Sequence, residues 1–264
     1  MSRLITIGCS LTQYDYPTWA DMAGTHFEEH YNLGNPGCGH NYMLNIFTEA
    51  DILLNLGEGD TVIVMSTSFV RYDVWLPNGD WGWQGNGNVY VGMPQEFLKN
   101  FYSDEHNLMQ SFSCLKSIYE ICKSKKINFI LLKGFPTDFN NHYYNVDVEF
   151  FDNQINELFN FKNFPSLKEF TEEQMGEYKG YEWQDQDGKI DQHPTMLMHH
   201  RYLKKLLPQY SINEDYLNLL EQRIDLSSKE NNIQLFDDVK GKKLGSLITR
   251  NFSNDYMKNF KYSG

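Results

Sequence analysis

The pattern that most constrains the fold of this chain is an alternation of short apolar runs with segments of helical periodicity. Residues 4–8, 60–65 and 127–132 are apolar runs with the length of buried strands. Between them, residues 41–56 and 107–124 repeat their apolar side chains at the spacing of one helix face. Strands and helices that alternate in this way are typical of βαβ units. The sequence therefore predicts an α/β fold with a parallel sheet.

Two more elements are expected close to the N-terminus. Residues 16–23 have Pro17 early and apolar residues at helical spacing, which indicates a helix. Residues 28–33 are expected to form a second strand. A loop over residues 34–39, rich in glycine, closes that strand.

Two insertions interrupt the α/β pattern, and a polar segment follows it. We predict one α/β domain over residues 1–208, with insertions around 72–105 and 136–190. Residues 209–264 form a C-terminal extension, in which a helix is expected. The first insertion contains three tryptophans: Trp75, Trp81 and Trp83. It is expected to form either a long aromatic loop or a hairpin.

Charge and composition exclude several classes of partner. The formal net charge is -12 and the isoelectric point is about 5.1, so phosphate backbones and anionic lipids are repelled. We therefore expect neither nucleic acid nor membrane as a partner. Aromatic residues make up 15% of the chain. They suit stacking on sugar rings, or are large side chains of a polar chain, and both interpretations stay open.

The cysteines and the first residues bear on location. The four cysteines have neither the spacing of a metal site nor that of a disulfide framework. The chain runs directly into its first predicted strand, so we expect no signal peptide. We expect a cytoplasmic protein with reduced thiols, while export by another route and a viral origin stay open. The oligomeric state is not indicated.

Three residues could form a nucleophilic triad. Ser10 stands just beyond the first strand, where parallel sheets gather their reactive groups. A serine hydroxyl needs a positioned base that is itself oriented by a third group. Asp191 and His193 stand two residues apart near the other end of the domain, and Pro194 is expected to begin the following helix. Taken alone, Ser10 could be a helix or turn cap, and His193 could be a surface or cap histidine.

The loop over residues 34–39 could supply the oxyanion site. Its glycines would let backbone N–H groups approach a developing negative charge closely. An ordinary glycine-rich turn is the alternative when this loop is considered alone.

Taken together, these blocks resemble the SGNH, or GDSL-like, hydrolase family. Gly8 to Leu11 looks like the nucleophile block of that family, with Cys9 in place of its aspartate. The resemblance maps the oxyanion glycine to Gly37, and the last block to Asp191 and His193. It covers roughly residues 3–206. It implies a three-layer α/β/α fold of flavodoxin-like type, oxyanion donation by the Ser10 and Gly37 N–H groups, and no cofactor or metal.

One block departs from the family pattern. The family's third block presents an asparagine after a Val-rich strand, whereas the strand over residues 60–65 is followed here by serines and a threonine. Either Ser66 or Ser68 could donate a hydrogen bond in the oxyanion hole, and Asn41 is a further candidate donor. Arg71 could reach inward as a cation, and we predict that it binds substrate together with the tryptophans of the first insertion.

The same residues allow other interpretations. Cys9 beside Ser10 suggests a thiol mechanism, but neighbours at a strand end point to opposite faces. A metal site would need Cys38, His40, His199 and His200, and adjacent histidines on one helix point in different directions. The segment with Asp185, Asp187 and Asp191 lacks the terminal glutamate of a calcium loop. We expect no metal.

The resemblance implies an esterase that hydrolyses a small acyl group, which we expect to be acetyl, on a small molecule or a glycan. An acyltransferase with the same triad is an alternative. A non-catalytic carbohydrate-binding or structural protein on this fold is another, and the missing third-block asparagine favours it.

Overall fold

In the computed structural model, the described residues are 2–14, 16–76, 82–135, 165–174, 193–213 and 217. Their centre is a sheet of four parallel strands in the order β2-β1-β3-β6. The strands are β1 (Arg3–Ile7), β2 (Glu29–Asn32), β3 (Thr61–Ser66) and β6 (Asn128–Lys133). The prediction of a parallel sheet is confirmed. The order is that of flavodoxin-like doubly wound sheets, in which the connections diverge at β1 and β3.

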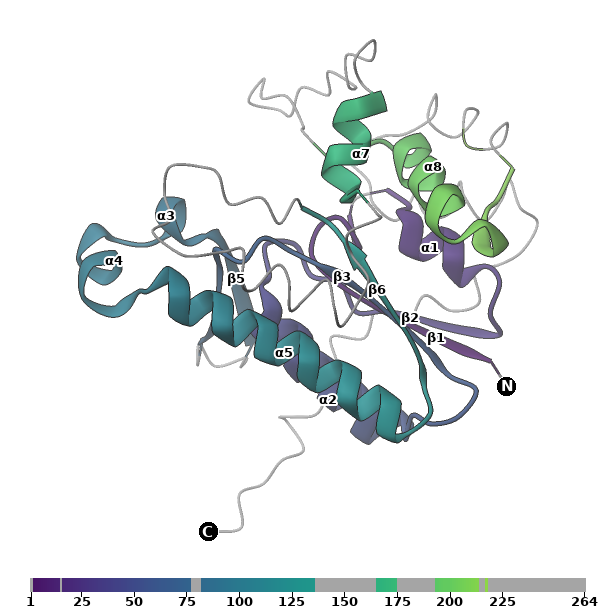
Figure 1. Cartoon of the computed structure of the whole chain (residues 1–264), viewed down its shortest axis with the longest axis horizontal. Coiled ribbons are helices and arrows are strands. Elements are labelled where there is room, and N and C mark those ends of the chain that lie inside the picture. The colour runs from purple at the N-terminus through teal and green to yellow at the C-terminus, as the bar shows by residue number, and fades with distance from the viewer. Residues whose placement is uncertain are drawn as a thin grey trace.

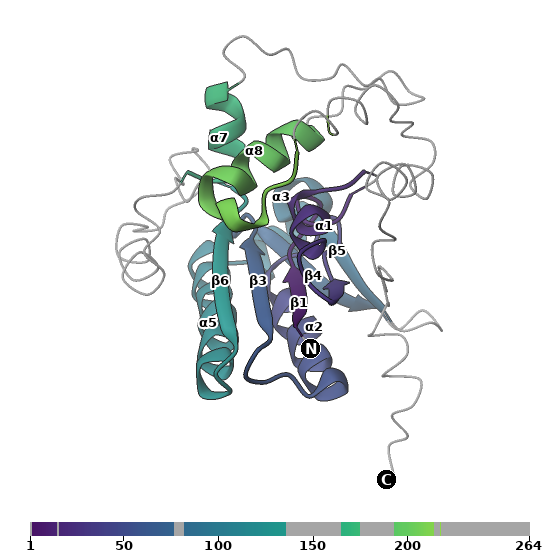
Figure 2. The ribbon, with the colours of Figure 1, turned by 90° about the vertical axis from the view of Figure 1, so that its right-hand side faces the viewer.

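Helices cover both faces of this sheet. On one face, α2 (His40–Leu54) packs beside α5 (Asp104–Ser124), as Figure 1 shows. On the other face, α1 (Trp19–Gly24) packs against α8 (Met196–Leu206), as Figure 2 shows from the side. The chain therefore has the expected three-layer α/β/α architecture.

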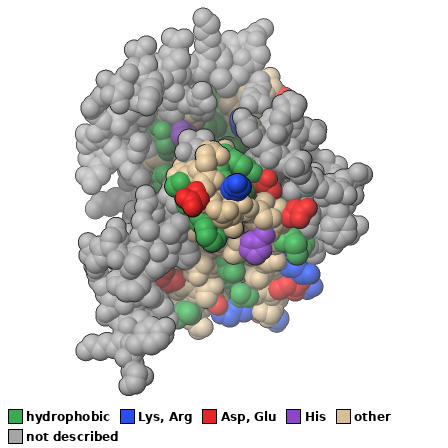
Figure 3. All heavy atoms as spheres, turned by 90° about the vertical axis from the view of Figure 1, so that its left-hand side faces the viewer, with side chains coloured by type: hydrophobic (Ala, Val, Ile, Leu, Met, Phe, Trp, Pro, Cys, Tyr) green, Lys and Arg blue, Asp and Glu red, His purple; other side chains and the backbone are tan. Residues whose placement is uncertain are grey.

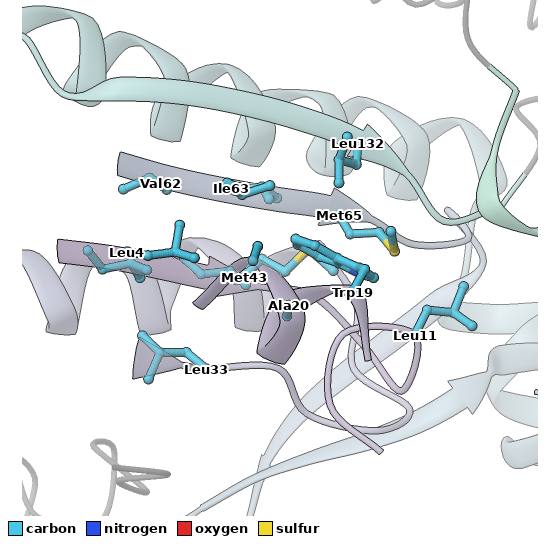
Figure 4. Close-up of a cluster of buried hydrophobic side chains, with 14 of the residues drawn as sticks. Leu4, Leu11, Trp19, Ala20, Leu33, Met43, Val62, Ile63, Met65 and Leu132 are labelled. Atoms are coloured by element: carbon cyan, nitrogen blue, oxygen red, sulfur yellow. The ribbon is translucent and has the colours of Figure 1, made fainter. Parts of the chain in front are cut away.

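The core forms where these layers meet. All six residues of β3 are buried, because helices cover both faces of a central parallel strand. In Figure 4, Val62 and Ile63 of β3 lie beside Leu4 of β1. Trp19 of α1 and Met43 of α2 are also fully buried in this cluster. The continuous apolar runs of the sequence thus become the middle layer of the fold.

Threonine caps set the starts of α1 and α8. Thr18 accepts from the Ala20 N–H and forms a capping box with Asp21, so α1 begins three residues later than the sequence pattern suggested. Thr195 caps α8 by accepting from the Met198 N–H at 3.3 Å. Pro194 is therefore not the first residue of this helix, contrary to the prediction. The Thr195 hydroxyl accepts from a free N–H of the first turn, whereas the Pro194 side chain has no acceptor with which to cap the helix.

The first insertion contains a hairpin and two short helices. Strands β4 (Arg71–Leu76) and β5 (Gly82–Asn88) pair antiparallel, which decides between the loop and the hairpin. The chain then forms α3 (Val89–Gly92) and α4 (Gln95–Phe101). Neither short helix was predicted. Figure 3 views this side of the molecule, where acidic and basic side chains lie among apolar ones on the described surface.

Later in the chain, α7 (Leu167–Gln174) packs beside α8, and a 3-10 turn (Pro208–Tyr210) follows α8. The rest of the second insertion and nearly all of the C-terminal extension lie outside the described residues. Within the described segments, none of the helices combines the length and apolar character that a bilayer crossing requires.

At the amino end of the sheet, a bidentate ion pair ties β1 to the loop before β3. Arg3 donates from Nε and Nη2 to the two carboxylate oxygens of Asp60, at 2.7 and 2.6 Å. The Asp60 carboxylate also accepts from the Gly57 N–H at 2.8 Å. This carboxylate is at the end of the sheet opposite to the candidate site.

Candidate active site

Ser10 lies in a tight turn that directly follows β1. The Cys9 carbonyl accepts from the N–H groups of Thr12 and Gln13, at 2.8 and 3.1 Å. A side chain at Gly8 would put its Cβ 2.0 Å from Thr12 Oγ1, so only glycine fits before this turn. Ser10 is 7% exposed and stands at the carboxyl end of the strand where the sheet order reverses, the usual position of sites in such folds.

The loop that contains Gly37 packs directly against the Ser10 turn. The Asn35 N–H donates to the Gly8 carbonyl at 2.9 Å, and the Cys38 thiol donates to the same oxygen at 3.2 Å. A Cβ at Gly34 would lie 2.9 Å from the backbone nitrogen of Gln13. Gly37 has φ of 78°, a left-handed conformation that favours glycine. The two N-terminal blocks of the sequence therefore form one contiguous surface.

His193, from the far end of the domain, lies against the segment that follows the Ser10 turn. Its ring stacks on Tyr14, with centroids 3.9 Å apart and planes inclined by 24°. The Tyr16 hydroxyl donates to the Pro194 carbonyl at 2.7 Å. Both tyrosines belong to the segment that follows the Ser10 turn. Residues 193 and 194 are thereby held against the chain just after the candidate nucleophile.

Two predicted site residues, Asp191 and Trp81, lie outside the described residues. Trp75 and Trp83 are direct cross-strand partners in the β4–β5 hairpin by their backbones. The role of Asp191 in orienting the base, and that of the three tryptophans in binding substrate, stay predictions.

The segment after β3 contains two further predicted site residues, Ser68 and Arg71. The Ser68 carbonyl accepts from the Arg71 N–H at 3.2 Å, which closes a turn, and Ser68 is half-buried. Arg71 donates from Nη1 to the Cys38 carbonyl at 3.5 Å, and its guanidinium lies 5.3 Å from the centre of the Phe135 ring. The Arg71 cation is thus placed beside the loop that contains Gly37.

Asn41 is in the first turn of α2. Its Oδ1 accepts from the Cys114 thiol of α5 at 3.4 Å. The amide oxygen is thereby engaged with α5. The Nδ2 group is the donor of the amide, and it is the atom that could donate to an oxyanion.

Two polar residues near the site were missed by sequence reasoning. Asp73 of β4 accepts from the N–H groups of Gly39 and Tyr42, at 2.6 and 2.9 Å. Asn107 of α5 donates from Nδ2 to the carbonyls of Phe69 and Arg71. The one sequence signal was negative: Gly39 is the N-cap of α2 and has no side chain with which to cap it.

Burial shapes the electrostatics here. Burial raises the pKa of the Asp73 carboxyl, although the N–H groups of Tyr42 and Gly39, and the charge of Arg71, act in the opposite direction. Burial lowers the pKa of His40 to about 3, and the Arg71 charge adds to this effect. The His40 ring stacks on Phe69, with centroids 5.0 Å apart. The pKa of His199 is also lowered to about 3, by burial and by His193. Both histidines are neutral at pH 7.

No family model matches the chain, and no curated protein matches it. Solved structures do. The chain is similar to a lipolytic protein of the G-D-S-L family from Veillonella parvula, with 13% identity and a TM-score of 0.45 over 79% of this chain and 100% of that one. For a putative G-D-S-L lipolytic protein from Desulfitobacterium hafniense the values are 18%, 0.41, 78% and 99%.

A GDSL-like lipase from Bacteroides thetaiotaomicron is similar at 18% identity, with a TM-score of 0.42 over 78% of this chain and 86% of that one. Similarities at this level, with identities of 13 to 18% and TM-scores of 0.41 to 0.45, support no conclusion about activity. The function of the chain therefore has to be argued from its own residues.

Proposed function

We propose that this chain is a serine esterase of SGNH type that removes a small acyl group, acetyl in the first instance, from a hydroxyl of a carbohydrate or other small molecule. One observation carries the proposal. His193 and Pro194 contact Tyr14 and Tyr16, which follow the Ser10 turn, although 178 residues separate the hydrogen-bonded pair. Nucleophile and base candidates thus come from distant parts of the chain to one end of the sheet.

In the proposed mechanism, Ser10 Oγ attacks the ester carbonyl and His193 takes its proton as general base. The same imidazole then protonates the leaving alcohol. Asp191 orients the ring and stabilises the imidazolium form. Water attacks the acyl-enzyme in the second half of the cycle, with His193 again as base. No cofactor or metal is needed for this sequence of steps.

The oxyanion would be held chiefly by backbone N–H groups of Ser10 and Gly37. The packing of the Gly34–Cys38 region on the Ser10 turn supports this pairing, because it places the two segments in contact. Ser68 and Asn41 are the candidates for a third donor. Arg71, with Trp75, Trp81 and Trp83, is proposed to bind the remainder of the substrate.

The test is hydrolysis of p-nitrophenyl acetate and butyrate by the wild type and by Ser10→Ala, between pH 6 and 9. We expect turnover that disappears in Ser10→Ala and in His193→Ala. Ser124→Ala is the matched control, because Ser124 lies at the far end of α5 and its hydroxyl donates only to the Ile121 carbonyl. Its turnover should equal that of the wild type.

A fluorophosphonate probe gives a second measurement that does not depend on the choice of ester. Labelling of the folded wild type at Ser10, and none of Ser10→Ala, supports the esterase. Folded protein with neither labelling nor Ser10-dependent turnover contradicts it and favours a binding protein on this fold. Acetylated sugars should then be tested as substrates of an active enzyme, with a second sugar present to detect acyl transfer.

A further inference from the structure

The N-terminus of α2 is capped from another part of the chain. Gly39, its N-cap residue, has no side chain, and the Asp73 carboxylate takes over that role from β4. Oδ1 accepts from the Gly39 N–H at 2.6 Å, and Oδ2 accepts from the Tyr42 N–H at 2.9 Å. Asp73 is only 9% exposed. Two free N–H groups of the first turn are therefore satisfied by a residue more than 30 positions away.

The two segments approach closely at position 39, so a side chain there would require the Asp73 carboxylate or the Arg71 carbonyl to shift. A Cβ on Gly39 would lie 2.9 Å from Asp73 Oδ2 and 3.0 Å from the Arg71 carbonyl. The missing side chain at Gly39 therefore has two effects: it leaves α2 without a cap of its own, and it leaves room for the Asp73 carboxylate.

The segment that contains Asp73 is itself held in place. Asn107 of α5 donates to the carbonyls of Phe69 and Arg71, on the stretch leading into β4. Arg71 in turn donates to the Cys38 carbonyl at 3.5 Å. The carboxylate is therefore presented from a backbone that α5 fixes on one side and the Cys38 carbonyl fixes on the other.

The loop around Gly37 is consequently anchored at both ends. On one side the Asn35 N–H donates to the Gly8 carbonyl, next to the Ser10 turn. On the other side the Gly39 N–H donates to Asp73. Gly37 lies between these anchors in a left-handed conformation, so a shift of either anchor would move its N–H.

We propose that Asp73 is a positioning residue for the oxyanion site: it fixes the loop of Gly37 by capping α2, without touching the substrate. This inference rests on the proposed esterase function. Misplacing an oxyanion donor weakens contacts that are strongest in the transition state, so the loss falls on kcat more than on KM. The same capping bonds connect the aromatic β4–β5 hairpin, which begins at Arg71, to the oxyanion loop.

The experiment compares Asp73→Ala and Asp73→Asn with the wild type, using p-nitrophenyl acetate. The matched control is Asp60→Ala, which removes another buried aspartate whose carboxylate accepts a backbone N–H, at the opposite end of the sheet. All variants are first checked for cooperative unfolding, and kcat and KM are measured separately.

We expect Asp73→Ala to lower kcat by about tenfold to a hundredfold with KM changed less than about threefold. Asp73→Asn keeps one oxygen acceptor and should recover part of the loss. Asp60→Ala should lose stability and keep the wild-type kcat. If Asp73→Ala does not fold, the comparison of Asp73→Asn with Asp60→Ala makes the same distinction.

Three outcomes would contradict the inference. Folded Asp73 variants with the wild-type kcat overturn it and leave the esterase intact. An equal loss of kcat in Asp60→Ala also overturns it, because general destabilisation would then account for both results. A wild type without Ser10-dependent turnover removes the proposed function, and the inference with it.

Discussion

The ring of Tyr14 stacks on the imidazole of His193, with centroids 3.9 Å apart. The two residues are at opposite ends of the domain in sequence, and the contact brings the last block of the chain to the segment after Ser10. A stacked ring restricts the rotation of the imidazole. The orientation of the candidate base therefore depends on a residue from the nucleophile's own segment.

Replacing Tyr14 tests this dependence. Tyr14→Ala removes the ring, and we expect kcat for p-nitrophenyl acetate to fall by about tenfold, since a mobile base spends less time in reacting geometry. Tyr14→Phe keeps the stacked ring and should retain most of the activity. Equal activity of Tyr14→Ala and the wild type would show that the stack does not position His193.

Gly34→Ala tests the contact between the two N-terminal blocks. The added Cβ would lie 2.9 Å from both the backbone nitrogen and the Cβ of Gln13, and neither can move without shifting the Ser10 turn. We expect a loss of about 1 to 3 kcal/mol in the free energy of unfolding and at least tenfold in kcat. Urea denaturation and ester hydrolysis measure the two effects.

The matched control for this change is Gly57→Ala, because a Cβ at Gly57 has no atom within 4 Å. It should keep both stability and activity. A Gly34→Ala variant that behaves like this control would contradict the tight packing of the two loops.

The buried histidines predict a loss of stability in acid. Burial lowers the pKa of His30 from 6.5 to about 3, so below pH 6.5 the unfolded chain binds a proton that the folded chain refuses. Stability is therefore full above pH 6.5 and falls as the pH drops toward 3. Between pH 7.5 and pH 5, His30 alone should account for about 2 kcal/mol of the free energy of unfolding.

His30→Leu should reduce the pH dependence by that amount in urea denaturation at the two pH values. Its absolute stability will also change, because the Thr6 hydroxyl loses its 3.0 Å partner, so only the difference between the two pH values is compared. His106→Gln is the control, since His106 is exposed on α5. An unchanged pH dependence in His30→Leu would argue against a neutral, buried His30.

Arg3→Ala should destabilise the fold and leave catalysis alone. It deprives the buried Asp60 carboxylate of its bidentate partner and frees the Leu54 carbonyl. We expect a loss of about 2 kcal/mol in the free energy of unfolding. Arg3→Lys should recover only part of it, because an ammonium cannot match the fork of two hydrogen bonds. A changed kcat in folded Arg3→Ala would contradict the separation of this ion pair from the site.

The sequence by itself determined the layered fold. The apolar runs at residues 60–65 and 127–132, and the helical periodicity between them, are patterns of nearby residues. A continuous apolar run suits a strand buried on both faces, and i, i+3, i+4 spacing suits one face of a helix. The same local reasoning placed Ser10 at a strand end and Gly37 in a loop, because a turn is written in the few residues that form it.

The tertiary structure decided what depends on distant partners. The pattern could not choose between a loop and a hairpin for the first insertion, since pairing of β4 with β5 is a property of both strands. It also could not show that Asp73 caps α2, because the carboxylate and the Gly39 N–H are 34 residues apart and meet only when β4 is placed. The stacking of Tyr14 on His193 has the same origin. Local periodicity is encoded by adjacent residues, whereas caps and stacks across the sheet depend on where the folded layers bring each side chain.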